Sequence, residues 1–132
     1  MDRRWNIYVT RMMPKPAMDL LEEHCDVEIF PDDRAITRKE LLEKVKGRDA
    51  ILSMVTETID AEVLNAAGPN CKIIANYAVG YNNIDVNEAT KRGIMVTNTP
   101  DVLTTATAEM AWALLFAVTR RISEAERYVR AG

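Results

Sequence analysis

Residues 72–97, KIIANYAVGYNNIDVNEATKRGIMVT, hold a short β-branched run, a turn, a helix signal and a second run in close succession. The runs Lys72 to Ala78 and Ile94 to Thr97 are expected to form strands. Between them, Asp85 can cap a helix, and Gly93 suits the left-handed conformation that ends one. A strand, a helix and a further strand predict a parallel sheet with a crossover helix.

The same alternation extends toward the N-terminus of the chain. Three earlier β-branched runs predict strands, at Asn6 to Thr10, Asp26 to Phe30 and Ala50 to Val55. Thr37 followed by Glu40 is a capping-box signature for a helix between two of them. Asp60 opens another helix, which Gly68 and Pro69 close. Five strands with intervening helices predict an α/β domain, and the flavodoxin-like parallel order 2-1-3-4-5 is the commonest with this strand count.

The pattern changes after Pro100, where no further strand is expected. Thr104 or Thr105 can cap a helix that runs to about residue 120. A second helix is expected at Ile122 to Arg130. We therefore predict a flavodoxin-like domain over residues 1–99 and a C-terminal helical extension over residues 100–132.

Helix 104–120 is apolar around its whole circumference, as its sequence TTATAEMAWALLFAVTR shows. Such a helix is usually covered on several sides, and a five-stranded sheet covers only one. Leaving its large side chains in water would forfeit on the order of 10 kcal/mol. We expect a second subunit or a further domain to cover it.

Composition excludes several classes of protein. The net charge of −3 and the scattered Lys and Arg residues provide no basic stripe, which argues against a nucleic-acid partner. The longest apolar segment, residues 106–118, is shorter than the ~20 residues of a membrane span. The N-terminal segment lacks an export signal. Cys25 and Cys71 have no metal-ligand or redox companion, so no metal site is expected and a reducing cytoplasm fits best.

The turn after strand 72–78 is the strongest candidate for a binding site. In a parallel α/β sheet, ligands bind outside the carboxyl ends of the strands. Successive backbone amides of Ala78 to Tyr81 could bind an anion there, and Gly80 would let the backbone approach it closely. Hydrogen bonds from amides to a carboxylate contribute about 1.5 to 3 kcal/mol each. The alternative is an ordinary turn in which Gly80 serves only the local geometry, and the spacing alone favours this second interpretation.

Other catalytic signatures are absent from the sequence. The glycines at positions 47, 68, 80, 93 and 132 are too far apart for GxGxxG or a P-loop. His24, the single histidine, lies near the end of an expected helix and is interpreted as structural. The first and third predicted strands do not end in the acidic cluster that a phosphoacceptor site needs.

Four motifs in one order and spacing carry a family resemblance: AVGYNNID, ATKRGI, VTNTPDVLT and TAEMAWALL. With them, the chain resembles the N-terminal part of the D-isomer-specific 2-hydroxyacid dehydrogenases, nearest the glyoxylate/hydroxypyruvate reductases. The resemblance spans the whole chain. Asn82 replaces the Asp of the usual family form GYDNID, which removes one charge from a turn. The resemblance implies the substrate-binding domain of a two-domain enzyme whose active site lies in the cleft between the domains.

The resemblance also implies roles for individual positions. The backbone matching Val79 and Gly80 holds the substrate carboxylate in the family, and positions matching Met54 and Val55 line the pocket. Thr107 matches a position that faces the nicotinamide cofactor, and the helix around Trp112 belongs with the cofactor domain and the dimer interface. Together with the amide argument above, the candidate substrate-binding residues are Met54, Val55, Ala78, Val79 and Gly80.

The nucleotide fingerprint and the catalytic Arg, Glu and His of the family match no residue of this chain. His24 does not replace the acid/base His, which belongs to the other domain in the family. The resemblance implies that the intact enzyme transfers hydride from NAD(P)H to a 2-oxo acid, with His protonating the product and Arg polarising the carbonyl. The chain alone is expected to bind no cofactor and to be inactive.

A second hypothesis is a non-catalytic module that binds small carboxylates or mediates oligomerisation. Both hypotheses predict self-association through helix 104–120, as a homodimer or a swapped oligomer. They differ in whether an encoded GxGxxG segment follows these residues.

Overall fold

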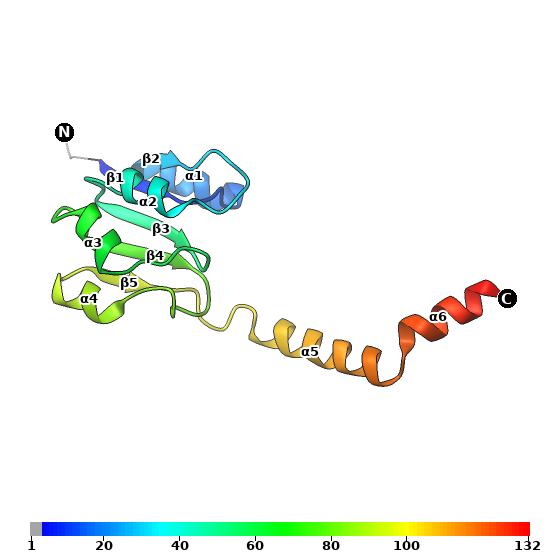
Figure 1. Ribbon diagram of the computed structural model, residues 1–132. Coiled ribbons are helices and arrows are strands. Elements are labelled where there is room, and N and C mark those ends of the chain that lie inside the picture. Colours follow the sequence, from blue (N-terminus) through cyan, green and yellow to red (C-terminus); the bar gives the residue numbers. More distant parts are fainter. Residues whose placement is uncertain (1–3) are drawn as a thin grey trace. The chain divides into compact units, whose positions relative to one another are not determined.

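The computed structural model describes residues 4–132, which form two compact units, the first ending at Pro100 and the second beginning at Asp101. The strands of the first unit are β1 (Trp5–Val9), β2 (Cys25–Ile29), β3 (Ala50–Met54), β4 (Ile73–Tyr77) and β5 (Met95–Thr97). Its helices are α1 (Lys15–His24), α2 (Arg38–Lys44), α3 (Ala61–Ala67) and α4 (Val86–Lys91). The second unit contains α5 (Thr104–Thr119) and α6 (Ile122–Ala131) (Figure 1).

The five strands form one parallel sheet in the order β2-β1-β3-β4-β5, which confirms the predicted α/β class and topology. The register pairs Val9 of β1 with Leu52 of β3, and Met54 of β3 with Tyr77 of β4. The carboxyl ends of these three central strands therefore meet at one edge of the sheet.

Helices cover both faces of this sheet. Tyr8, Ile51 and Ile74 belong to the larger apolar cluster, which also contains buried residues of α2, α3 and α4. Ile7 and Val9 belong to a smaller cluster with residues of α1. Since neighbouring strand residues point to opposite faces, α1 lies on one face and the other three helices on the opposite face. Each fully buried large side chain contributes about 1.5 to 3 kcal/mol.

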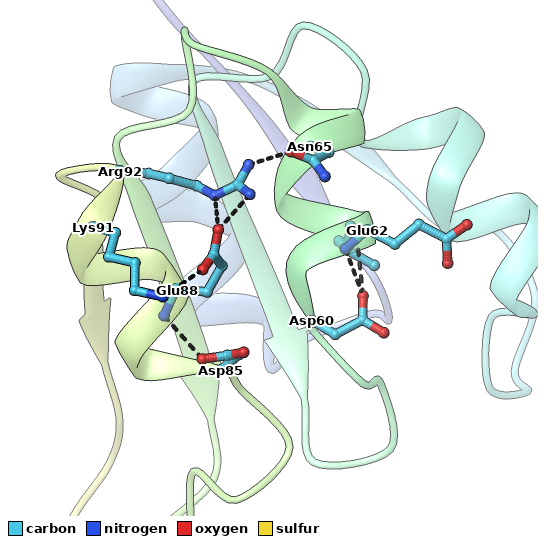
Figure 2. Close-up of polar contacts among 8 residues, drawn as sticks. Asp60, Glu62, Asn65, Asp85, Glu88, Lys91 and Arg92 are labelled. Atoms are coloured by element: carbon cyan, nitrogen blue, oxygen red, sulfur yellow. Dashed lines mark hydrogen bonds and ion pairs between the residues drawn. The ribbon is translucent and has the colours of Figure 1, made fainter.

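The helix starts follow from local side-chain chemistry. The hydroxyl of Thr37 accepts a hydrogen bond from the Glu40 amide, and the Glu40 carboxylate accepts one from the Thr37 amide. This reciprocal pair confirms the predicted capping box. Asp60 caps α3, and Asp85 caps α4 by accepting from the amide of Glu88 (Figure 2).

Helices α3 and α4 are also joined at their surface. The guanidinium of Arg92 donates to Glu88 within α4 and, at 2.6 Å, to the Oδ1 atom of Asn65 in α3 (Figure 2). Gly93, which follows, has φ 68°, the left-handed conformation expected where a helix ends.

The start of α5 differs from the sequence-based prediction. Leu103 is the N-cap residue, and no side chain caps the helix, so neither Thr104 nor Thr105 plays the expected role. Asp101 has φ 64°, and the Thr104 amide donates to its carbonyl at 3.4 Å. Both threonines thus already lie inside the first helical turn. No residue of α5 or α6 is buried. Among the described residues, no helix has the length and apolar character that a membrane span requires.

Candidate functional site

The segment between β4 and α4 lies at the carboxyl edge of the sheet and is anchored through its carbonyl groups. Three successive carbonyl oxygens accept hydrogen bonds from elsewhere in the first unit. The pairs are Ala78 with the amide of Thr99 (2.9 Å), Val79 with Nδ2 of Asn98 (2.8 Å), and Gly80 with Nδ2 of Asn76 (2.9 Å). The backbone of the turn is thus held from β4, through Asn76, and from the segment after β5, through Asn98 and Thr99.

The amide groups of the same turn differ in whether they donate a hydrogen bond to another described residue. The N–H of Ala78 donates to the carbonyl of Asn76 at 2.8 Å. This corrects the expectation that the Ala78 amide is available to an anion. The N–H groups of Val79, Gly80 and Tyr81 donate to no acceptor within residues 4–132. The candidate anion-binding groups are therefore the amides of three consecutive residues, Val79 to Tyr81.

Gly80 is not required by the fold itself. It is exposed, its φ lies outside the left-handed region, and a Cβ atom built on it would meet nothing within 4 Å. Neither turn geometry nor packing therefore demands glycine here. This observation counts against the interpretation in which Gly80 serves only the turn.

The end of β3 lies next to this turn. Met54 pairs with Tyr77 in the sheet register, and Val55, which follows, is 58% exposed. The amide of Met54 donates to the carboxylate of Glu57 at 2.6 Å. Its carbonyl accepts from Nδ2 of Asn83 at 3.1 Å. Met54 is thus held by both neighbouring loops.

Glu57 is a buried carboxylate that the sequence analysis did not single out. Only 4% of its surface is exposed. Its oxygens accept hydrogen bonds from the hydroxyl of Thr10 (2.7 Å), the amide of Met54 (2.6 Å) and the hydroxyl of Thr56 (2.5 Å). Three donors offset part of the cost of removing this group from water. Glu57 thereby fixes the loop that carries Met54 and Val55.

Asn83 joins the two loops. Its Nδ2 atom donates to the carbonyls of Met54 and Glu57, and its carboxamide pairs reciprocally with that of buried Asn76 at 3.1 and 3.3 Å. The backbone repeats the connection, because the amide of Ile59 donates to the carbonyl of Asn83 at 2.8 Å. No short-range sequence signal reveals the bonds from Asn83 to Met54 and Glu57, since they join positions 29 and 26 residues apart in the chain.

Two further sequence candidates lie elsewhere. Thr107 is exposed in α5, in the second unit, and its amide donates to Leu103 within that helix. Its role toward a cofactor stays a prediction. His24 is the last residue of α1 and precedes the first residue of β2, at the amino edge of the sheet. That edge is opposite to the candidate site, which agrees with a structural role for His24.

Comparison with known proteins identifies the family. The family model described as D-isomer specific 2-hydroxyacid dehydrogenase, catalytic domain, matches residues 7–130. The chain belongs to this family. The matched residues include part of β1, all of β2 to β5, all of α5 and nearly all of α6. Family membership therefore rests on residues of both units.

The curated relatives of this dehydrogenase-family chain include several archaeal glyoxylate reductases. The glyoxylate reductase of Thermococcus kodakarensis is 54% identical over 129 residues, which are 98% of this chain and 38% of the relative. That of Pyrococcus furiosus is 52% identical over 126 residues, 96% of this chain and 37% of the relative. The chain thus spans less than two fifths of the length of these relatives.

Solved structures show the same fold. A protein from Thermus thermophilus has a TM-score of 0.82 and 42% identity, with 96% of this chain and 40% of that chain covered. The NADPH-dependent glyoxylate/hydroxypyruvate reductase of Sinorhizobium meliloti, in complex with NADP and malonate, has a TM-score of 0.73 and 30% identity. That likeness covers 98% of this chain and 39% of the other.

Proposed function

We propose that this chain is the substrate-binding portion of an NAD(P)-dependent D-2-hydroxyacid dehydrogenase of the glyoxylate/hydroxypyruvate reductase type. The enzyme reduces 2-oxo acids by hydride transfer. The observation that carries the proposal is the run of three amides, Val79 to Tyr81, at the carboxyl edge of the sheet. They donate to no acceptor in the part of the chain that the structure describes. Family membership and the glyoxylate reductases among the relatives support it.

The proposed role of these residues is to orient the substrate. Amide hydrogen bonds to a carboxylate contribute about 1.5 to 3 kcal/mol each, so two or three of them hold a small acid without a cationic side chain. Met54 and Val55 line the pocket beside the bound acid. A fixed carboxylate limits where the neighbouring 2-oxo carbon can lie, which is how orientation contributes to rate. The malonate of the Sinorhizobium complex is also a small carboxylate.

The cofactor is assigned to a part of the protein outside these residues. The five glycines of the chain form no dinucleotide fingerprint, so the residues present do not fit a nucleotide site. We propose that Thr107 faces the nicotinamide from across the cleft. The chain supplies no catalytic acid or base, and alone it is inactive.

A second subunit is the proposed partner of α5. Six large apolar side chains of this helix are between 49% and 76% exposed: Met110, Trp112, Leu114, Leu115, Phe116 and Val118. Burying such side chains is favourable by about 1.5 to 3 kcal/mol each. We propose a homodimer or a swapped oligomer through this helix. Cys25 and Cys71 are free thiols, which supports a location in the reducing cytoplasm.

Binding at the turn is tested by titration of the ¹⁵N-labelled chain. Hydroxypyruvate is expected to shift the amide resonances of Val79, Gly80 and Tyr81. Dihydroxyacetone, in which a hydroxymethyl group replaces the carboxylate, is the matched neutral control and is expected to leave them unchanged. Shifts that are absent, or that are the same for both compounds, contradict the proposal.

Gly80→Ala tests the same site by mutation. The added Cβ atom meets nothing within 4 Å, so the fold is expected to persist. The methyl group keeps the anion from close approach, and loss of one charge-assisted hydrogen bond lowers affinity by at least about tenfold. Unchanged affinity would remove Gly80 from the site.

A hybrid enzyme separates the two hypotheses on function. This chain replaces the matching N-terminal segment of the Thermococcus kodakarensis glyoxylate reductase. We expect the hybrid to reduce glyoxylate with a nicotinamide cofactor, whereas the chain alone shows no turnover. A folded hybrid without activity favours the non-catalytic module, and turnover by the chain alone contradicts its proposed inactivity.

A further inference from the structure

We propose that Asn98 and Asn76 are positioning residues that set the direction of the anion-binding amides. The inference rests on the proposed function of the turn and explains how its amides are kept available. Each of the two side chains donates a hydrogen bond to a carbonyl of the turn, Asn98 to Val79 at 2.8 Å and Asn76 to Gly80 at 2.9 Å.

The geometry of the peptide unit links the direction of each carbonyl to that of the next amide. In a trans peptide, the C=O of one residue and the N–H of the next point in opposite directions. No peptide bond of the described chain is cis. Asn98 holds the carbonyl of Val79, so the N–H of Gly80 must point away from Asn98. Asn76 holds the carbonyl of Gly80 and directs the N–H of Tyr81 in the same manner.

The same bonds also strengthen the amides as donors. A hydrogen bond at a carbonyl polarises the peptide unit, which strengthens a neighbouring bond by roughly 10–30%. The effect reaches the N–H groups of Gly80 and Tyr81, since they share peptide units with the two held carbonyls. Asn98 and Asn76 thus act on a bound anion through the backbone without touching it.

Asn76 is itself rigidly held. It is 2% exposed, and its Oδ1 atom lies 3.1 Å from the donating hydroxyl of Ser53 and accepts from Nδ2 of Asn83. Its Nδ2 atom donates to Gly80 and to Oδ1 of Asn83. Both N–H groups and the oxygen are therefore used, which leaves one orientation of the carboxamide. Asn98 is half-buried, and its bond to Val79 is flanked by the bond from Thr99 to Ala78.

A purely structural role predicts a different outcome. If these side chains only satisfy carbonyl groups, their removal lowers stability and leaves anion affinity unchanged. If they direct the amides, removal lowers affinity even where stability is nearly kept. Asn98 is the better residue to test, because the structure gives its side chain one hydrogen bond and only partial burial.

The test compares Asn98→Ala with Asn82→Ala in the full 132-residue chain. Asn82 is exposed in the same turn, and its side chain makes no hydrogen bond within residues 4–132, so it is the matched control. Hydroxypyruvate affinity is measured from the amide shifts of Val79 to Tyr81. We expect Asn98→Ala to bind about tenfold more weakly and Asn82→Ala to bind like the parent chain. Asn98→Ala is also expected to move the Gly80 amide resonance before any ligand is added.

Two further variants complete the design. Asn98→Asp and Asn82→Asp add the same charge near the turn. Only Asn98→Asp removes a donor that is bonded to the turn, so only this variant should weaken binding strongly. If Asn98→Ala does not fold, Asn98→Ser is judged by the same criterion.

Each possible result decides for or against the positioning role. Equal affinity of the folded Asn98 and Asn82 variants overturns the positioning role and leaves the proposed function intact. A parent chain whose Val79 to Tyr81 amides do not respond to hydroxypyruvate overturns the proposed function, and the inference with it.

Discussion

The two units of this chain use apolar residues in opposite ways. In residues 4–100, apolar side chains of the strands and of the four helices are buried in two clusters on the faces of the sheet, or are partly buried against these clusters. In residues 101–132, no side chain is buried, although α5 has the most apolar sequence of the chain. The first unit contains its own core. The second unit contains a helix with the composition of a core helix, but the side chains of this helix are exposed. Its sequence is therefore suited to contacts with a further protein surface.

The largest expected effect contrasts one leucine from each unit. Leu64 in α3 is 1% exposed, whereas Leu114 in α5 is 58% exposed. Leu64→Ala leaves a cavity in the core and is expected to lower the free energy of unfolding by about 2–5 kcal/mol. Leu114→Ala is expected to change the stability of the first unit very little.

The measurement uses the two tryptophans, since Trp5 lies in β1 and Trp112 in α5. Urea unfolding is followed by Trp5 fluorescence in a Trp112→Phe background. Equal losses for both leucine variants would show that α5 contributes to the core of the first unit.

The next effect concerns self-association. We expect the sedimentation coefficient of the parent chain to rise with concentration. Trp112→Lys places a charge in the proposed interface and removes about 1.5 to 3 kcal/mol of apolar burial, so association weakens by more than tenfold. Leu20→Lys, on a 60% exposed residue of α1, is the control and should leave association unchanged. A parent chain that stays monomeric at all concentrations contradicts the proposed interface.

A smaller effect compares two threonines at helix starts. The Thr37 hydroxyl accepts from the Glu40 amide, whereas Thr104 makes no cap bond. Thr37→Ala is expected to cost about 1 kcal/mol of stability, measured by chemical denaturation. Thr104→Ala is expected to be neutral, or slightly favourable for α5 because alanine has the higher helix propensity. A similar cost at both positions would mean that Thr104 has a partner that α5 itself does not provide.

The contrast between Thr37 and Thr104 shows why some parts of the structure could be predicted from the sequence. The caps Thr37, Asp60 and Asp85 bond to amides within three residues, so a local pattern is enough to find them. The strand order followed from element count and a general preference. At Thr104, the local pattern misled because the turn at Asp101 already provides the helix start.

The site was predicted only in part, for a physical reason. Gly80 could be proposed as a candidate because a glycine after a strand is a local signal. The Ala78 amide bonds to the Asn76 carbonyl, two residues away, which is a matter of local backbone conformation that residue types do not reveal. The roles of Glu57 and Asn83 depend on the tertiary fold. Asn83 reaches Met54, 29 residues earlier, and Glu57 reaches Thr10, 47 residues earlier. Such bonds leave no periodic or motif signature, so they appear only when the strands are placed side by side.

The smallest expected effect contrasts two ion pairs of the same spacing. Glu88 pairs with Arg92 in α4, and Glu126 pairs with Arg130 in α6, both four residues apart. The side chains of the first pair are 22% and 27% exposed, and those of the second 58% and 78%. Hydrogen bonds from Arg92 and then Lys91 lower the pKa of Glu88 below its usual 4.5 (Figure 2).

A lowered pKa in the folded state means that ionised Glu88 stabilises the fold. This contribution is complete above the unfolded pKa near 4.5 and is lost as the pH falls through the folded value. Glu88→Gln is therefore expected to lower the unfolding midpoint slightly at neutral pH, and the difference from the parent chain should disappear in acid. Glu126→Gln should show no difference at either pH, because its exposed pair is screened by solvent. Parallel pH profiles for the parent chain and Glu88→Gln would mean that the pair between Arg92 and Glu88 does not stabilise the fold.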